Sequence, residues 1–142
     1  MKRAFLQRAA IFNPTLTIVL ATLVAAFGLA APAAIAGDRI AAADAGQHPN
    51  QQATVCGLVA GAKYADRSRG KPTFLDFEKP HPAEVFKVVI WGSDRSKFKT
   101  PPEAMYEQKR VCVTGRIQLF RGAPEIVVRD PAQLTLDEGA AP

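Results

Sequence analysis

The sequence predicts an all-β domain, a five-stranded Greek-key barrel with one short helix between its third and fourth strands. Three observations support this fold class: the β-branched runs are short, Gly and Pro residues separate them, and one segment has a helical start signal. The clearest run extends from Val111 to Val128, with Arg121-Gly122 between two nearly alternating halves. Because Gly122 permits a tight reversal, this segment predicts a β-hairpin.

The remaining elements follow in chain order from the same signals. Gly57 within the first run indicates a bend or bulge, as small barrels need where strands curl. Pro102 can begin the helix, since a proline in the first turn costs no hydrogen bond. Residues 132–136 are expected to pack back onto the barrel. The predicted strands are 54–60, 73–78, 85–91, 111–119 and 125–128. An open sandwich or roll of the same strands is the alternative.

The N-terminal segment has the composition of a secretory signal. Lys2, Arg3 and Arg8 precede an apolar run at 16–31, and Ala34-Ile35-Ala36 offers small residues for cleavage. An uncleaved membrane anchor is the alternative, because the run approaches spanning length. The sequence therefore predicts a signal peptide at 1–36, a flexible leader at 37–52, a folded domain at 53–136 and a disordered tail at 137–142, in a periplasmic or secreted protein.

Charge and cysteine content narrow the function classes only slightly. Residues 53–136 carry 14 basic and 9 acidic side chains, a net charge of +5, whereas residues 37–142 carry 15 and 13, a net charge of +2. This mild bias allows a polyanionic partner without requiring one. The two cysteines, Cys56 and Cys112, are expected to form a disulfide if the chain is exported. Two buried free thiols are the alternative.

Several segments resemble the OB-fold (oligonucleotide/oligosaccharide-binding) family, in particular its tRNA-anticodon-binding-like group. The resemblance covers about residues 53–134. It is carried by VCGLV at 55–59, PTFLDFEKP at 72–80, FKVVIW at 86–91, RVCVTGRI at 110–117 and FRGAPEIVV at 120–128. In that fold the first strand pairs with the fourth. The resemblance thus implies that Cys56 and Cys112 lie on adjacent strands, within bonding reach if their Cα atoms are within roughly 7 Å.

The resemblance also implies where a ligand would lie: across the second and third strands, between the loops after the first and fourth. Single-stranded nucleic acid requires cations for its backbone and flat rings for its bases, and both occur at these places. The candidate residues are Lys63, Tyr64, Arg67, Arg69, Lys71, Phe74, Lys87, Trp91, Arg95, Lys97, Phe120 and Arg121. The alternatives are a solvated loop at 63–71 and core or barrel-end positions for Trp91 and Phe74.

No catalytic pattern emerges from the sequence. The histidines are His48, in the leader, and His81, between two prolines, and no Cys/His spacing predicts a zinc site. Asp76 and Glu78 share a predicted strand face, which a solvent-facing strand edge explains without acid–base chemistry. We therefore expect no enzyme activity, no metal and no cofactor.

The predicted function is an exported, non-enzymatic OB-fold protein that binds single-stranded nucleic acid through its basic loops and aromatic residues. The alternative is a periplasmic envelope or stress protein that uses the same barrel to bind a protein, a glycan or a small ligand. An accessory domain of a secreted nuclease is a weaker third hypothesis. No stable membrane insertion is expected after cleavage of the signal, and the sequence leaves the oligomeric state open.

Overall fold

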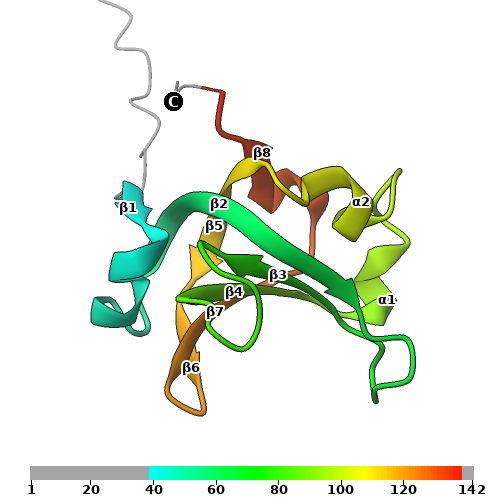
Figure 1. Ribbon diagram of the computed structural model, residues 1–142, viewed down its shortest axis with the longest axis horizontal. Coiled ribbons are helices and arrows are strands. Elements are labelled where there is room, and N and C mark those ends of the chain that lie inside the picture. The colour runs from blue at the N-terminus through cyan, green and yellow to red at the C-terminus, as the bar shows by residue number, and fades with distance from the viewer. Residues whose placement is uncertain (1–38, 139–142) are drawn as a thin grey trace, which may run out of the picture. The chain divides into compact units, whose positions relative to one another are not determined.

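The computed structural model describes residues 39–138, so the predicted signal segment at 1–36 lies outside the described residues. Within that range the chain forms eight strands and four short helical segments (Figure 1). The strands are β1 (Arg39–Ala41), β2 (Gln52–Tyr64), β3 (Thr73–Phe77), β4 (Phe86–Ile90), β5 (Arg110–Arg116), β6 (Gln118–Phe120), β7 (Ala123–Val128) and β8 (Leu134–Leu136). The helical segments are the 3-10 turns η1 (Ala42–Gln47) and η2 (Pro131–Gln133) and the α-helices α1 (Gly92–Arg95) and α2 (Pro102–Tyr106).

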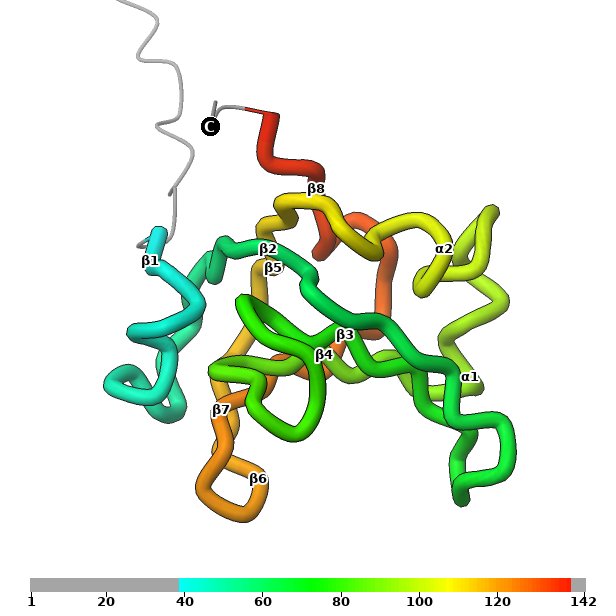
Figure 2. Tube along the Cα trace, viewed as in Figure 1, coloured from blue at the N-terminus to red at the C-terminus, as the bar shows by residue number. Residues whose placement is uncertain are grey.

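The long strand β2 organises the sheet. Its first half pairs antiparallel with β5 and its second half antiparallel with β3, with a register shift between Val59 and Gly61. The full strand order is β6-β7-β4-β3-β2-β5-β8, with β1 alongside β2, and β4 pairs with β7 in parallel. Figure 2 shows β2 curving across the length of the domain. The strand predicted to be first therefore pairs with the one predicted to be fourth, as expected.

The all-β prediction is confirmed, but the closed five-stranded barrel is not, because the described residues form an eight-stranded sheet. One reason is that the predicted strand 111–119 is interrupted at Ile117. The Ile117 N–H donates to the Gln51 carbonyl at 2.9 Å, and the Ile117 carbonyl accepts from Asn50 N–H at 2.8 Å. These bonds to the chain before β2 bend the strand, and its end continues as β6.

The predicted hairpin is present as β6 and β7. Phe120 and Ala123 are register partners, so the turn consists of two residues, Arg121 and Gly122. Both have positive φ angles, 52° and 84°. A two-residue turn with two positive φ angles matches the right-handed twist of the flanking strands, and glycine adopts the second position without strain.

The segment 39–52 differs from the flexible leader that the sequence predicts. Arg39–Ala41 forms a parallel strand beside β2, and the following turn, η1, places Ala42 and Ala45 in the core, 1% and 0% exposed. Small apolar residues pack here without helical or strand periodicity, so the sequence pattern gives no signal. Asp137, assigned to the predicted tail, donates its N–H to the Arg110 carbonyl and forms an ion pair with Arg39. Residues 139–142 lie outside the described residues.

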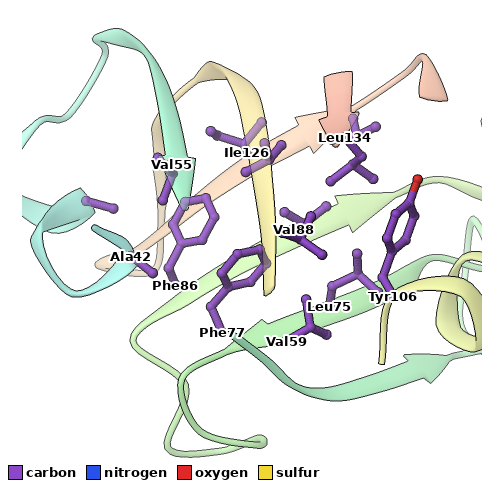
Figure 3. Close-up of a cluster of buried hydrophobic side chains, with 14 of the residues drawn as sticks. Ala42, Val55, Val59, Leu75, Phe77, Phe86, Val88, Tyr106, Ile126 and Leu134 are labelled. Carbon is purple, nitrogen blue, oxygen red and sulfur yellow. The ribbon is translucent and has the colours of Figure 1, made fainter. Parts of the chain in front are cut away.

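The hydrophobic core lies on one face of β3 and β4 (Figure 3). Leu75 and Phe77 of β3 and Phe86 and Val88 of β4 are each 1% exposed or less. The Phe77 and Phe86 rings meet edge to face with centroids 5.2 Å apart, a favoured aromatic geometry. Since side chains alternate along a strand, the intervening residues of β3 and β4 face outward.

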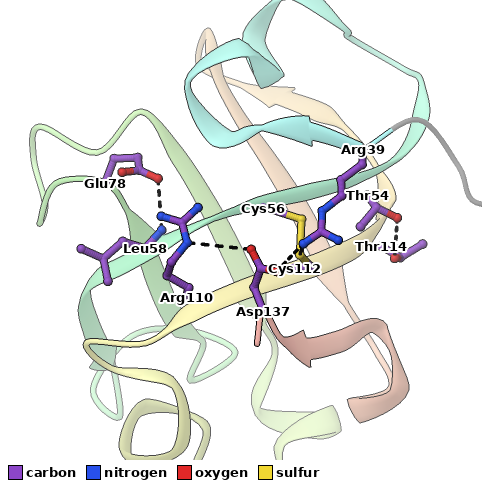
Figure 4. Close-up of a disulfide and its surroundings, with 9 residues drawn as sticks. All are labelled: Arg39, Thr54, Cys56, Leu58, Glu78, Arg110, Cys112, Thr114 and Asp137. Atoms are coloured by element: carbon purple, nitrogen blue, oxygen red, sulfur yellow. Dashed lines mark hydrogen bonds and ion pairs between the residues drawn. A yellow bond between two sulfur atoms is a disulfide. The ribbon is translucent and has the colours of Figure 1, made fainter. Parts of the chain in front are cut away.

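The predicted disulfide is present between Cys56 and Cys112 (Figure 4). The two cysteines are direct register partners on β2 and β5, with Cα atoms 4.1 Å apart. The predicted helix is also confirmed, as α2 begins at Pro102, whereas α1 was not predicted. Among residues 39–138, no helix has the length and apolar character needed to cross a membrane.

Candidate functional site

The outward face of β2, β3, β4 and β7 carries three of the predicted ligand-binding residues, Lys63, Phe74 and Lys87. Two rows of register partners cross it. The first row runs Lys63, Phe74, Val89, Val127, and the second runs Gly61, Asp76, Lys87, Glu125. We call this surface the outer face. It lies opposite the core, and the loop 65–72, which joins β2 to β3, adjoins the end of the first row.

The loop 65–72 packs against Trp91, which follows the last residue of β4. The Gly92 N–H donates to the Gly70 carbonyl at 3.0 Å, and Ala65 N–H donates to the Pro72 carbonyl at 2.8 Å. Gly70 has a φ of +78°, and a Cβ there would lie 2.9 Å from the Trp91 ring. Only a glycine lets the backbone pass so close to the indole. Trp91 remains 41% exposed, so the loop covers part of the ring and leaves part open.

The cations of this loop are free of ion pairs within the described residues. Arg67, Arg69 and Lys71 are exposed, and so is Lys63 at the end of β2. No salt bridge among residues 39–138 involves any of these four side chains. The structure therefore leaves these four cations without an ion-pair partner among residues 39–138, in and beside a loop whose Gly70 packs against the Trp91 ring and which also carries the exposed Asp66.

A pocket of about 270 Å³ lies between the loop and the outer face. It brings three of the predicted residues together, Lys63, Phe74 and Lys87. The Phe74 ring is half-buried, and Lys87 Nζ lies 5.3 Å from its centroid, within the range of a cation–π contact. The pocket is lined by Lys63, Ala65, Ser68, Phe74, Asp76, His81 and Lys87.

Lys87 is surrounded by carboxylates that the sequence analysis did not recognise. Asp76 and Glu125 are its register partners on the neighbouring strands, and Glu84 accepts a hydrogen bond from its ammonium at 2.6 Å. The charge of Lys87 is thus compensated, which weakens its predicted role as a phosphate ligand. Strand register brings Asp76 and Glu125 beside Lys87, which spacing along the chain does not indicate, whereas Glu84 lies only three residues before Lys87 in the sequence.

Burial acts to raise the pKa values of the carboxyl groups in this cluster, and hydrogen bonding lowers that of Glu84. Burial, followed by the charge of Glu84, raises the pKa of Asp76, and burial likewise raises the pKa of Glu125. Burial alone would also raise the pKa of Glu84. Hydrogen bonds from Lys87 and His81 outweigh that effect and lower it to about 2.

The expectation of a solvent-facing pair at Asp76 and Glu78 is wrong. Asp76 is only 5% exposed, and its Oδ1 has no hydrogen-bond partner among the described residues. Glu78 is exposed, but its Oε1 accepts a hydrogen bond from the Leu58 N–H at 3.1 Å (Figure 4). The Asp76 carboxylate is buried at the outer face, whereas the Glu78 carboxylate is hydrogen-bonded to the backbone of β2. The two carboxylates therefore have separate environments.

Tyr64 and Arg95 form a packed cluster away from the pocket. The Arg95 guanidinium lies 3.9 Å from the Tyr64 ring centroid. It also donates to both carboxylate oxygens of Glu103, each at 2.5 Å, and to Thr73 Oγ1 at 2.7 Å. These hydrogen bonds raise the pKa of Arg95 and lower that of Glu103. Arg95 joins β3 to α2, so its geometry is that of a structural residue and not of a free phosphate ligand.

Lys97 also has hydrogen-bond partners within the protein. Its ammonium donates to Asp94 at 2.7 Å and to the Arg129 carbonyl at 2.8 Å. Like Arg95, it belongs to the α1 region, where its charge is partly compensated. Both residues were predicted on the ligand face because they follow Trp91, but Glu103 on α2 pairs with Arg95, and Asp94, three residues before Lys97, pairs with Lys97.

Phe120 and Arg121 lie at the tip of the β6–β7 hairpin. Phe120 is 59% exposed, and the Arg121 guanidinium is 5.4 Å from its ring centroid. Figure 1 shows this hairpin and the loop 65–72 extending at opposite ends of the lower side of the domain as drawn. The registers place the tip beyond Glu125 on β7 and the loop beyond Lys63 on β2. The two basic tips therefore lie at different corners of the sheet.

The described residues contain one grouping with metal-ligand geometry, Cys56, Cys112 and Asp137. Both sulfur atoms are in the disulfide, and disulfide sulfur is not the thiolate that metal ions bind. The Asp137 carboxylate is paired with Arg39, whose guanidinium also contacts Cys112 Sγ at 3.0 Å (Figure 4). The residues present do not fit a metal ion there.

Comparison with protein-family models found no match, and none was found among curated proteins. Among solved structures, the chain is similar to a putative aspartyl-tRNA synthetase from Leishmania major Friedlin, with 10% identity and a TM-score of 0.43. That alignment covers 66% of this chain and 20% of the synthetase, so the chain spans about a fifth of that protein. It is also similar to the second OB-fold domain of replication protein A from Methanococcus maripaludis, with 18% identity, a TM-score of 0.38, and 66% and 91% of the two chains covered.

Proposed function

We propose that the chain is an OB-type domain that binds single-stranded nucleic acid across its outer face, without catalysis. The strand pairing supports the OB assignment. A bent strand, β2, pairs with both β3 and β5, β4 pairs in parallel with β7, and a helix lies between β4 and β5. The strands β1, β6 and β8 are short additions to these five.

One observation carries the functional proposal: the exposed Trp91 ring beside the cations of the loop 65–72. Arg67, Arg69, Lys71 and Lys63 supply the positive charge that a phosphate backbone needs, and Trp91 offers a ring on which a base can stack. The exposed part of the Trp91 indole lies at the end of β4 beside a solvated loop. It therefore contributes nothing to the core.

The outer face has the dimensions of a binding surface for a few nucleotides. From β2 to β7 there are three strand spacings, roughly 14 Å, and the hairpin tip lies roughly 13 Å further along β7. A strand that crosses this diagonal would run from the loop to Arg121 and Phe120. We infer that the loop and the hairpin contact different nucleotides of the same strand.

Export to an oxidising compartment is part of the proposal. The signal-like composition of residues 1–36 supports it, as does the disulfide between Cys56 and Cys112, because disulfides persist outside the reducing cytosol. N-terminal sequencing of the chain recovered from a periplasmic fraction tests it. A mature N-terminus at Gly37 is the expected result, and an intact Met1 in the cytosolic fraction would refute it.

The alternative partner is an envelope protein, a glycan or a small ligand. The carboxylates around Lys87 favour this alternative over a pure polyanion site, because Asp76, Glu84 and Glu125 place negative charge in the middle of the face. Pull-down from envelope extract in the presence of excess oligonucleotide separates the two functions. A protein captured equally well with and without the competitor would support the alternative.

The direct test is a titration of fluorescently labelled single-stranded oligonucleotide with the mature chain at several salt concentrations. We expect affinity at low salt that falls as salt rises. Replacing Arg67 and Arg69 with Ala removes two phosphate contacts and makes the negative slope of log K against log salt shallower by about 1.4.

The matched control replaces two other exposed cations, Lys109 and Arg116, neither of which forms an ion pair within residues 39–138. This variant has the same net charge and is expected to retain most of the affinity. Absence of binding at low salt, or equal losses in the two variants, would remove the proposal. A parallel nuclease assay with added divalent metal is expected to show no cleavage.

A further inference from the structure

The pocket beneath the loop 65–72 contains a buried, unpaired hydrogen-bond acceptor. Asp76 lines this pocket, is 5% exposed, and has one carboxylate oxygen, Oδ1, that no described residue contacts as a donor. A buried polar atom without a partner costs free energy, and such atoms are rare in folded proteins. A ligand with an N–H group that enters the pocket can donate to the Asp76 carboxylate, which lines it.

The rest of the lining defines what kind of ligand fits. Phe74 supplies a flat apolar wall, and Lys63 places an ammonium group at the pocket that forms no ion pair among the described residues, whereas the Lys87 ammonium is paired with Glu84. The lysines disfavour a metal cation or an amine, although a carboxylate alone would attract either. A planar group that stacks on Phe74 and belongs to an anionic chain satisfies all of these features together. At about 270 Å³ the pocket accommodates one such group and not an extended stack.

We propose that this pocket holds a single base of the bound strand and selects a base with an exocyclic amino group, cytosine over thymine. The inference rests on the proposed function and deepens it. The N4 amino group of cytosine donates to a carboxylate, a pairing known from protein–DNA recognition. Thymine presents a carbonyl oxygen at the same position, which the Asp76 carboxylate repels. The loop cations and Trp91 bind without regard to sequence, and Asp76 adds the base preference.

The experiment compares labelled twelve-nucleotide strands of deoxycytidine and deoxythymidine in the same low-salt buffer. Both are pyrimidine homopolymers, and their bases differ in the group at C4, the proton on N3 and the 5-methyl group of thymine. We expect the deoxycytidine strand to bind about tenfold more tightly, the effect of one hydrogen bond to a charged group. Asp76→Asn keeps the side-chain shape but adds a donor, and it is expected to reduce the preference to less than twofold.

Two further variants make the result specific to the pocket. Asp44→Asn makes the same charge change at an exposed position of η1 and is expected to keep the tenfold preference. Ser68→Leu fills the pocket from the exposed loop. It is expected to lower affinity for the deoxycytidine strand to that for deoxythymidine and to leave the latter unchanged. Since Ser68 is exposed, this variant remains informative if Asp76→Asn does not fold.

The outcomes separate this inference from the proposed function. Equal, salt-sensitive binding of both strands by the unmodified chain would overturn the pocket assignment and leave the function standing. A preference retained in Asp76→Asn or in Ser68→Leu would also overturn it. Binding of neither strand at low salt would remove both proposals.

Discussion

At the scale of single residues, compensation of charge decides which predicted cations are available. Lys63 and Arg67 have no acidic partner in the described part of the chain, whereas Arg95 is held by Glu103 and Lys87 by Glu84. In the sequence alone, these four basic residues look equally available for binding. The placement of α2 brings Glu103 to Arg95, which spacing along the chain does not indicate, whereas Glu84 is a local partner three residues before Lys87. The candidate site was therefore predictable in its loop and not in its strand face.

Asp76 gives a residue-scale prediction for stability against pH. Its pKa is raised in the folded state, chiefly by burial and then by Glu84, while Lys87 and the His81 backbone oppose the shift. The folded state thus holds a proton that the unfolded state has released at pH values just above 3.8, so the stability contributed by this group falls as pH rises through the folded-state pKa.

Asp76→Asn removes this titration. We expect its free energy of unfolding, relative to the unmodified chain, to increase as pH rises from about 4 and then to level off. Urea denaturation across this pH range measures the difference, with Asp44→Asn as the control for a general loss of negative charge. A difference that shrinks with rising pH would show that the folded protein favours the ionised carboxylate.

At the scale of elements, the bent strand β2 joins the two parts of the sheet. It pairs with β5 through Gln52–Leu58 and with β3 through Val59–Tyr64. The disulfide cross-links β2 to β5 near the middle of the first pairing. The pairing of β2 with β3 ends at the basic loop 65–72. The β-branched pattern and the hairpin turn made these elements predictable. The short strand β1 was not, because three residues carry no reliable periodicity, whereas the expected packing of residues 132–136 onto the sheet is confirmed by the pairing of β8 with β5.

Replacing Cys56 and Cys112 with Ser tests how much the disulfide between β2 and β5 stabilises the fold. The disulfide closes a chain segment with a sequence separation of 56. Its loss is expected to lower the free energy of unfolding by about 2–4 kcal/mol, mainly because the unfolded chain gains freedom. Equilibrium urea unfolding measures this effect. Unmodified protein in excess reductant should match the variant, and equal midpoints with and without reductant would contradict the expectation.

At the scale of the whole molecule, the fold class was predictable and the closure of the sheet was not. Turn residues such as Gly122 and Pro102 mark where elements begin and end, and the OB resemblance supplied the pairing of the first and fourth strands. The residues 39–52 were missed because Ala42 and Ala45 pack through their small size, which leaves no amphipathic signature. Their burial extends the domain toward the N-terminus and enlarges its core.

The molecule also distributes its charge unevenly. The loop 65–72 and the hairpin tip are basic, while the centre of the outer face holds the carboxylates around Lys87. A bound strand would be held at two corners and would cross a surface that carries acceptors for base N–H groups. Under the proposed function, we expect this arrangement to bind flexible single strands, whose bases can turn toward the protein, better than a rigid duplex that presents its phosphates.

The most direct test of this account uses Trp91, which is the only tryptophan in the sequence. Its intrinsic fluorescence is measured while unlabelled single-stranded oligonucleotide is added, and salt is then added to reverse the binding. If bases stack on Trp91, the emission is quenched to saturation and recovers with salt, and Trp91→Leu lowers the affinity about tenfold. Unchanged emission while an oligonucleotide binds, or full affinity in Trp91→Leu, would contradict the account.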